Sequence, residues 1–268
     1  MHEVAVPHTH GIEGEGKSVL GTYTLPEGVS SSSPVPLILI ITGLDGYRTE
    51  LAAWCKGFAQ KGVATLIHEI PGTGDSPALR QDPTSPDRQW ASVFDWVAQQ
   101  KELDSKKSYT GGYYALRVAH TEKDRLLASV SLGGGAHHMF DREWLENVDK
   151  LEYPFDLAGT LTYKFGYKDL EDFIQNAQKF SLVNDGTLEK PCCRMLLVNG
   201  DMDEIFPIED LWVALAHGQP KEARIVEGKK HMGEPDSFFI ILKWIYALLG
   251  LPGDVMDQVK TLPFKPKY

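Results

Sequence analysis

The chain has few cysteines, no long apolar run and no excess of positive charge. Its three cysteines, Cys55, Cys192 and Cys193, cannot all pair within one chain and show no metal-ligand spacing, which favours a reducing compartment. The net charge of -10 argues against nucleic acid or an anionic membrane as a partner. Segment 238–249, the longest apolar one, contains Lys243 and is too short to cross a bilayer, and no signal peptide is recognisable at the start. We therefore expect a cytoplasmic protein.

Apolar segments that alternate with helical ones run through most of the 268 residues. A pair of strands is expected at 4–6 and 18–24, and the largely apolar run at 35–41 is typical of a strand buried on both faces of a parallel sheet. Further strands are expected at 63–67, 126–132, 195–198 and 223–226. Helical patterns occupy 50–61, 89–100 and 237–249. This alternation predicts one α/β domain over 1–268, with a mostly parallel sheet and helices on both faces. An aromatic-rich helical insertion at 141–185 is placed to form a lid.

Residues 108–117 contain the helical half of a nucleophile turn. In a serine hydrolase, a G-x-S-x-G turn between an apolar strand and a helix exposes the catalytic hydroxyl. Gly111 and Gly112 precede a good helical run, but segment 101–107 is charged almost throughout, which is untypical of a central strand. We expect no strand there, and Ser108 is the candidate nucleophile if it reaches the turn.

A carboxylate and an imidazole follow the last two predicted strands. Asp203 and His231 are expected to meet, because the carboxyl ends of parallel strands lie at one edge of a sheet. The order serine, acid, histidine is that of α/β-hydrolases. Segment 43–46 offers backbone N–H groups to a developing oxyanion. Structural alternatives stay open: a helix N-cap for Asp203, a non-catalytic role for His231 and an ordinary turn at 43–46.

Two other motifs give no cofactor prediction. His137 and His138 are adjacent, so their side chains point in different directions, and no third ligand at helical spacing was recognised. Segment 71–77 is glycine-rich but lacks the ending of a phosphate-binding loop. We expect no metal and no cofactor.

Several motifs together resemble one group of fungal α/β-hydrolases. They lie at 6–11, 43–45, 71–77, 111–115, 117–121, 164–167, 197–200 and 207–210. The group is similar to the hydrolases that shorten polyketide chains in pigment pathways and to those of fusarin and cytochalasan clusters. The resemblance covers nearly the whole chain. It implies an α/β-hydrolase fold and a serine hydrolase that acts on an ester or C–C bond of a polyketide-derived intermediate, or a related cyclising enzyme. By position, Asp203 is the triad acid, His231 the general base and Leu44 an oxyanion N–H donor.

The chain departs from this group in two places. The group's turn reads G-x-S-x-G-G-Y-Y, and its alignment on Gly111 and Gly112 puts Tyr109 at the nucleophile position and Ser108 one residue earlier. The helical region that members carry before the first strand has no counterpart here. A truncated, catalytically inactive hydrolase relic therefore stays open beside the enzyme, as does a binding role. The expected partner is a small-molecule, polyketide-derived substrate, with a homodimer left open.

Overall fold

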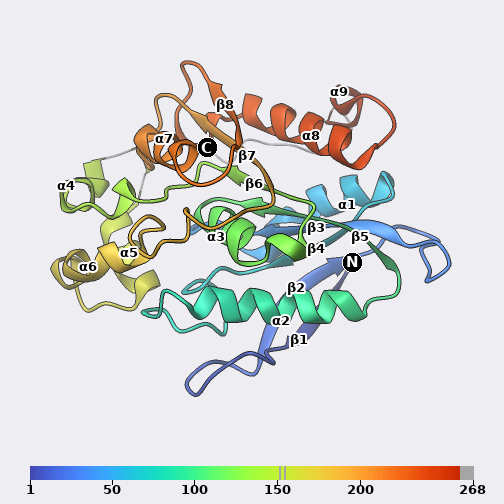
Figure 1. Ribbon diagram of the computed structural model, residues 1–268, viewed down its shortest axis with the longest axis horizontal. Helices are drawn as coiled ribbons and strands as arrows, with labels where there is room; N and C mark the ends of the chain where they lie inside the picture. The colour runs from blue at the N-terminus through green and yellow to red at the C-terminus, as the bar shows by residue number, and fades with distance from the viewer. Residues whose placement is uncertain (151, 154, 260–268) are drawn as a thin grey trace.

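An eight-stranded mixed sheet forms the centre of the molecule (Figure 1). The structure is a computed structural model that describes residues 1–150, 152–153 and 155–259. The strand order is β1-β2-β4-β3-β5-β6-β7-β8, in which β2 runs antiparallel to both neighbours and the remaining pairs are parallel. The strands are β1 (His2–Pro7), β2 (Ser18–Thr24), β3 (Val35–Ile41), β4 (Ala64–His68), β5 (Leu103–Gly111), β6 (Ala128–Leu132), β7 (Arg194–Gly200) and β8 (Glu222–Val226). The mostly parallel α/β architecture predicted from the sequence is confirmed.

Helices cover both faces of this sheet. Successive side chains of a strand point to opposite faces, so Leu39 of β3 joins one core and Ile40 the other. The Leu39 core includes Trp90 from α2 and residues of α3 and α7, and the Ile40 core includes Phe58 from α1 and residues of α8. These helices are α1 (Ala52–Gln60), α2 (Ser85–Gln99), α3 (Tyr113–Thr121), α7 (Ile208–Ala216) and α8 (Asp236–Leu249), after which comes α9 (Val255–Val259). In the described part of the chain, no helix is long and apolar enough to cross a membrane.

The central strand β5 forms, although the charge of segment 101–107 led us to predict no strand there. Residues 108–110 pair with both β3 and β6 and are uncharged. The preceding residues lie before the point where β6 begins to pair, and the β3 pairing has an irregularity between Val35 and Leu37. The prediction was wrong because the charged residues occupy the amino-terminal half of the strand, where β6 does not pair with them.

The segment 141–185 is helical, as expected, and packs on the carboxyl edge of the sheet. Lys164 reaches Pro71, in the loop after β4, and Tyr114 at the start of α3. Asp156 and Asp169 accept hydrogen bonds from backbone N–H groups at the start of two helices, which are N-caps typical of aspartate. The helices are α4 (Arg142–Leu145), α5 (Leu157–Phe165) and α6 (Leu170–Ala177). Residues 151 and 154 of this segment lie outside the described residues.

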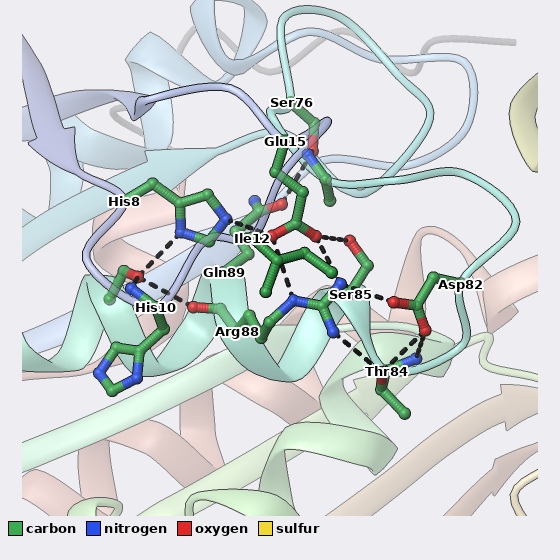
Figure 2. A network of polar contacts seen from close by, with 12 residues as sticks. His8, His10, Ile12, Glu15, Ser76, Asp82, Thr84, Ser85, Arg88 and Gln89 are labelled. Carbon is green, nitrogen blue, oxygen red and sulfur yellow. Dashed lines mark hydrogen bonds and ion pairs between the residues drawn. The ribbon is translucent and has the colours of Figure 1, made fainter.

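A buried polar network attaches the loop between β1 and β2 to α2 (Figure 2). Glu15 accepts hydrogen bonds from Arg88 Nη2 and Ser85 Oγ, both at 2.7 Å. Burial opposes ionisation of Glu15, but the hydrogen bonds from Arg88 and Ser85 lower its pKa to about 2. His8 Nδ1 lies 2.9 Å from Ser92 Oγ on the same helix, and its Nε2 lies 3.2 Å from Glu15. The network fixes the loop of the first hairpin against α2.

Candidate active site

Asp203 and His231 lie together at the carboxyl edge of the sheet. Asp203 follows β7, and His231 begins the short 3-10 turn that follows β8. Asp203 Oδ2 lies 3.0 Å from His231 Nδ1. Because a carboxylate only accepts hydrogen bonds, Nδ1 carries the proton in the neutral ring and Nε2 keeps its lone pair. This orientation lets the imidazole take a proton at Nε2, as a general base does.

The Asp203 carboxylate is held by backbone and side-chain donors. Oδ1 accepts from the N–H groups of Ile205 and Phe206 at 2.7 and 3.1 Å, and Oδ2 accepts from Asn199 Nδ2 at 2.7 Å. The side chain is fully buried, so these bonds replace the water that a carboxylate needs. Asp203 is not the N-cap of α7, which is Pro207.

Asn199 positions both halves of the acid–base pair, and the sequence analysis missed it. Its Oδ1 accepts from Gly200 N at 2.9 Å and from Met232 N at 3.0 Å, while its Nδ2 holds Asp203. Asn199 therefore connects the end of β7 to the residue after His231. The available signal was a buried amide at the end of an apolar strand, directly before Gly200.

Two rings and one acidic residue surround His231. The Tyr153 ring meets the imidazole edge-on with centroids 5.5 Å apart, and the Phe206 ring lies 5.4 Å away. The backbone N–H of His231 donates to Glu152 Oε1 at 2.9 Å. Glu152 and Tyr153 belong to the inserted segment, so the insertion supplies part of the wall around the base. Only 13% of the imidazole side chain is exposed.

A cavity of about 960 Å³ opens beside the imidazole. Its apolar wall comes mainly from α1, α8 and the end of β3, with Trp54, Phe58, Phe238 and Ile245 among its residues. Polar groups come from the loops at the carboxyl edge and include His231, Asp45, Glu152 and Lys230. The volume is at the upper end of the usual range for small-molecule sites. The cavity therefore suits a mostly apolar molecule with its polar part near His231.

The structure does not bring Ser108 to this pair. Ser108 lies inside β5, three residues before the strand ends at Gly111, so a rise of roughly 3.3 Å per residue puts it about 10 Å below the edge. Its Oγ is buried without a hydrogen-bond partner among the described residues, and Ser108 is not one of the described residues that line the cavity. Tyr109, the position aligned with the family nucleophile, points to the face of the sheet opposite to that of Ser108. It belongs to the Leu39 core, where its ring packs against Trp90. Ser108 and Tyr109 are therefore both buried within the sheet.

Leu44 lies in the turn after β3, beside the cavity. Its neighbours Gly43 and Asp45 line the cavity, whereas the Leu44 side chain packs against the Leu39 core. The backbone of this turn thus runs along the cavity wall. The role of the Leu44 N–H as an oxyanion donor stays a prediction.

His137 and His138 have a third potential ligand that the sequence analysis overlooked. Asp141 lies close enough that one ligand atom from each of the three residues falls within 4.8 Å of the others. The existing contacts already satisfy one nitrogen of each ring: His138 Nδ1 lies 2.8 Å from Asp141 Oδ2, and His137 Nδ1 lies 2.7 Å from Ser181 Oγ. His137, His138 and Asp141 could bind a divalent cation, but the hydrogen bonds to Ser181 and Asp141 also explain the positions of the two imidazole rings without a metal.

The sheet order, the helices on both faces and the acid–base pair after β7 and β8 define an α/β-hydrolase fold. Residues 8–232 match the family model described as "Esterase FrsA-like", so the chain belongs to the FrsA-like esterase family. A search of curated proteins finds no match to the sequence.

Several solved structures share this fold. AbyA5 superposes with a TM-score of 0.76 at 20% identity, covering 97% of this chain and 73% of that chain. The 2,6-dihydroxy-pseudo-oxynicotine hydrolase gives 0.71 at 19% identity, covering 100% of this chain and 71% of that chain. Est1E from Butyrivibrio proteoclasticus gives 0.63 at 16% identity, covering 97% of this chain and 100% of that chain. The predicted α/β-hydrolase fold is confirmed, and the family is one of esterases.

Proposed function

We propose that this protein is an esterase-type hydrolase in which His231, held by Asp203, is the general base. The observation that carries the proposal is the 3.0 Å contact between His231 Nδ1 and Asp203 Oδ2 beside a cavity of about 960 Å³. His231 Nε2 takes the proton of the attacking oxygen, and the buried carboxylate stabilises the imidazolium that forms. The Leu44 N–H and a first-turn amide of α3 bind the developing oxyanion, at roughly 3 kcal/mol for each donor.

The proposed substrate is an ester, or a C–C bond next to a carbonyl, in a polyketide-derived intermediate. Two lines support it. The sequence motifs resemble hydrolases of polyketide pathways, and the cavity wall is made of aromatic and aliphatic side chains such as Trp54 and Ile245. An apolar molecule buried there leaves its carbonyl near the polar groups at the carboxyl edge. The cavity volume supports a small-molecule partner.

Turnover of p-nitrophenyl esters tests the general base. We expect His231→Ala to reduce turnover by about 10²- to 10⁴-fold, because the proton acceptor is removed. His217→Ala is the matched control, since His217 Nδ1 bonds to Val213 O at 2.8 Å, its Nε2 lies 3.7 Å from the exposed Glu189, and it is not one of the described residues that line the cavity. Circular dichroism confirms that both variants fold. Equal turnover of His231→Ala and the wild type would overturn the proposal, and a folded wild type without turnover of any ester would favour the inactive relic.

A further inference from the structure

The turn between β5 and α3 consists of two glycines. The strand ends at Gly111 and the helix begins at Tyr113, so Gly112 is the N-cap of α3. In an α/β-hydrolase the nucleophile occupies the sharp junction between this strand and this helix. By structure, therefore, the nucleophile position is Gly112, one that carries no side chain.

Gly112, like Thr110 and Gly111 before it, lines the cavity that also contains the imidazole. A Cβ atom at Gly112 would meet Gly133 O at 3.4 Å and Leu132 O at 3.5 Å, at the end of β6. A Cβ atom at Gly133 would in turn meet His231 Cε1 at 3.0 Å. Gly112 and His231 both line the cavity. One glycine thus separates position 112 from the general base, whereas Ser108 lies lower in the strand.

We infer that this enzyme hydrolyses its substrate without a covalent intermediate, with water activated by His231 in front of Gly112. The inference rests on the proposed function and specifies its attacking group. His231 Nε2 takes one proton from water as the water oxygen bonds to the ester carbonyl carbon. The tetrahedral intermediate then expels the alkoxide as the C–O bond breaks, and the imidazolium returns the proton to that alkoxide. The products are a carboxylic acid and an alcohol, and His231 is neutral again.

The same geometry predicts that a serine at position 112 creates the missing nucleophile. The backbone of Gly112 has a negative φ of -99°, but its ψ of -120° lies between the α and β ranges of L-residues. The nearest neighbours of an added Cβ lie at 3.4 Å, which is ordinary contact. Serine is also a favoured N-cap residue. The contact distances and the N-cap preference favour folding of Gly112→Ser, and Gly112→Ala supplies the same Cβ and the same backbone demand without the hydroxyl.

Labelling with a fluorophosphonate, read by intact mass, tests the inference together with pre-steady-state turnover of p-nitrophenyl acetate. We expect the wild type and Gly112→Ala to stay unlabelled and to show no burst of p-nitrophenol. Gly112→Ser should take up close to one label per chain at residue 112 and should show a burst. Ser108→Ala should keep wild-type turnover, because its buried Oγ takes no part. Thermal melts followed by circular dichroism establish that each variant folds.

Labelling of the wild type at Ser108 or Thr110 would overturn the inference, as would a loss of turnover in folded Ser108→Ala. A folded Gly112→Ser that neither labels nor shows a burst would also overturn it, because position 112 would then not face the base. If the wild type lacks turnover while Gly112→Ser labels, the proposed hydrolysis fails and the assignment of position 112 stands. These outcomes separate the inference from the proposed function.

Discussion

Replacing Lys164 by methionine should remove a specific dependence of stability on pH. Lys164 lies in the inserted segment with its Nζ buried, and it donates to Pro71 O at 2.9 Å and to Tyr114 Oη at 2.7 Å. The ammonium also lies 4.2 Å from the Phe165 ring centroid. Burial lowers the pKa of Lys164 to about 7. Keeping the lysine protonated in the folded protein is therefore costly below that pH.

The sign and size of the effect follow from the two pKa values. An unfolded lysine titrates near its ordinary pKa of about 10.4, so between pH 7 and pH 10 the unfolded chain holds a proton that the folded chain has released. Stability then rises with pH, because the unfolded state binds more protons in this window. For a folded pKa of about 7, this single group raises the free energy of unfolding by about 2 kcal/mol from pH 7 to pH 9.

Urea unfolding of the wild type and Lys164→Met at pH 7 and pH 9 measures this contribution of Lys164 to the free energy of unfolding. Methionine leaves Pro71 O and Tyr114 Oη without their donor, at about 1–3 kcal/mol, but that cost does not change with pH here because burial keeps the pKa of Tyr114 well above 10. The difference between wild type and Lys164→Met should therefore shift by about 2 kcal/mol in favour of the wild type at pH 9. Lys168→Met is the matched control, since the Lys168 side chain is 88% exposed. A difference that stays constant from pH 7 to pH 9 would refute the reasoning.

Three further perturbations test other parts of the structure. Arg117→Met should lower the free energy of unfolding by about 2–3 kcal/mol, because it leaves Asp87 and Asp185 without the guanidinium that contacts them at 2.7 and 2.6 Å. An unchanged urea midpoint would contradict this expectation. Glu15 has a lowered pKa of about 2, so its contribution is present above about pH 4.5 and is lost as pH falls toward 2. Between pH 5 and pH 3 the free energy of unfolding of the wild type, measured by tryptophan fluorescence, should fall by about 2 kcal/mol more than that of Glu15→Gln. Equal losses in the two proteins would count against the network of Figure 2. Gly200→Ala would place a Cβ against the carbonyl oxygens of residues 229 and 230, so it should lower the free energy of unfolding by about 1–3 kcal/mol in a thermal melt and reduce ester turnover. A Gly200→Ala variant with the melting temperature of the wild type would contradict this.

Most of the architecture was predictable because buried parallel strands are apolar throughout. Segment 35–41 and the run before Asp203 show this pattern, whereas the strand before His231 contains Glu222 and Arg224 and lies at the edge of the sheet. These strands and the edge where Asp203 and His231 meet could be inferred. Strand β5 could not, because its amino-terminal half is charged and does not pair with β6. Composition alone cannot tell which part of a strand its neighbours cover.

The amino-acid sequence by itself determined the fold class, the helical character of the insertion and the chain order of acid and base. Only the tertiary structure decided which residue lies at the junction between β5 and α3. Alignment of the turn pointed to Tyr109 with Ser108 next to it, yet β3 and β6 pair with β5 in a register that buries both residues within the sheet. That register ends the strand at Gly111 and leaves Gly112 against Gly133 at the end of β6, in the wall of the cavity that His231 also lines. A shift of a few residues along one strand moves a side chain by about 10 Å, and no local pattern in the sequence specifies that register.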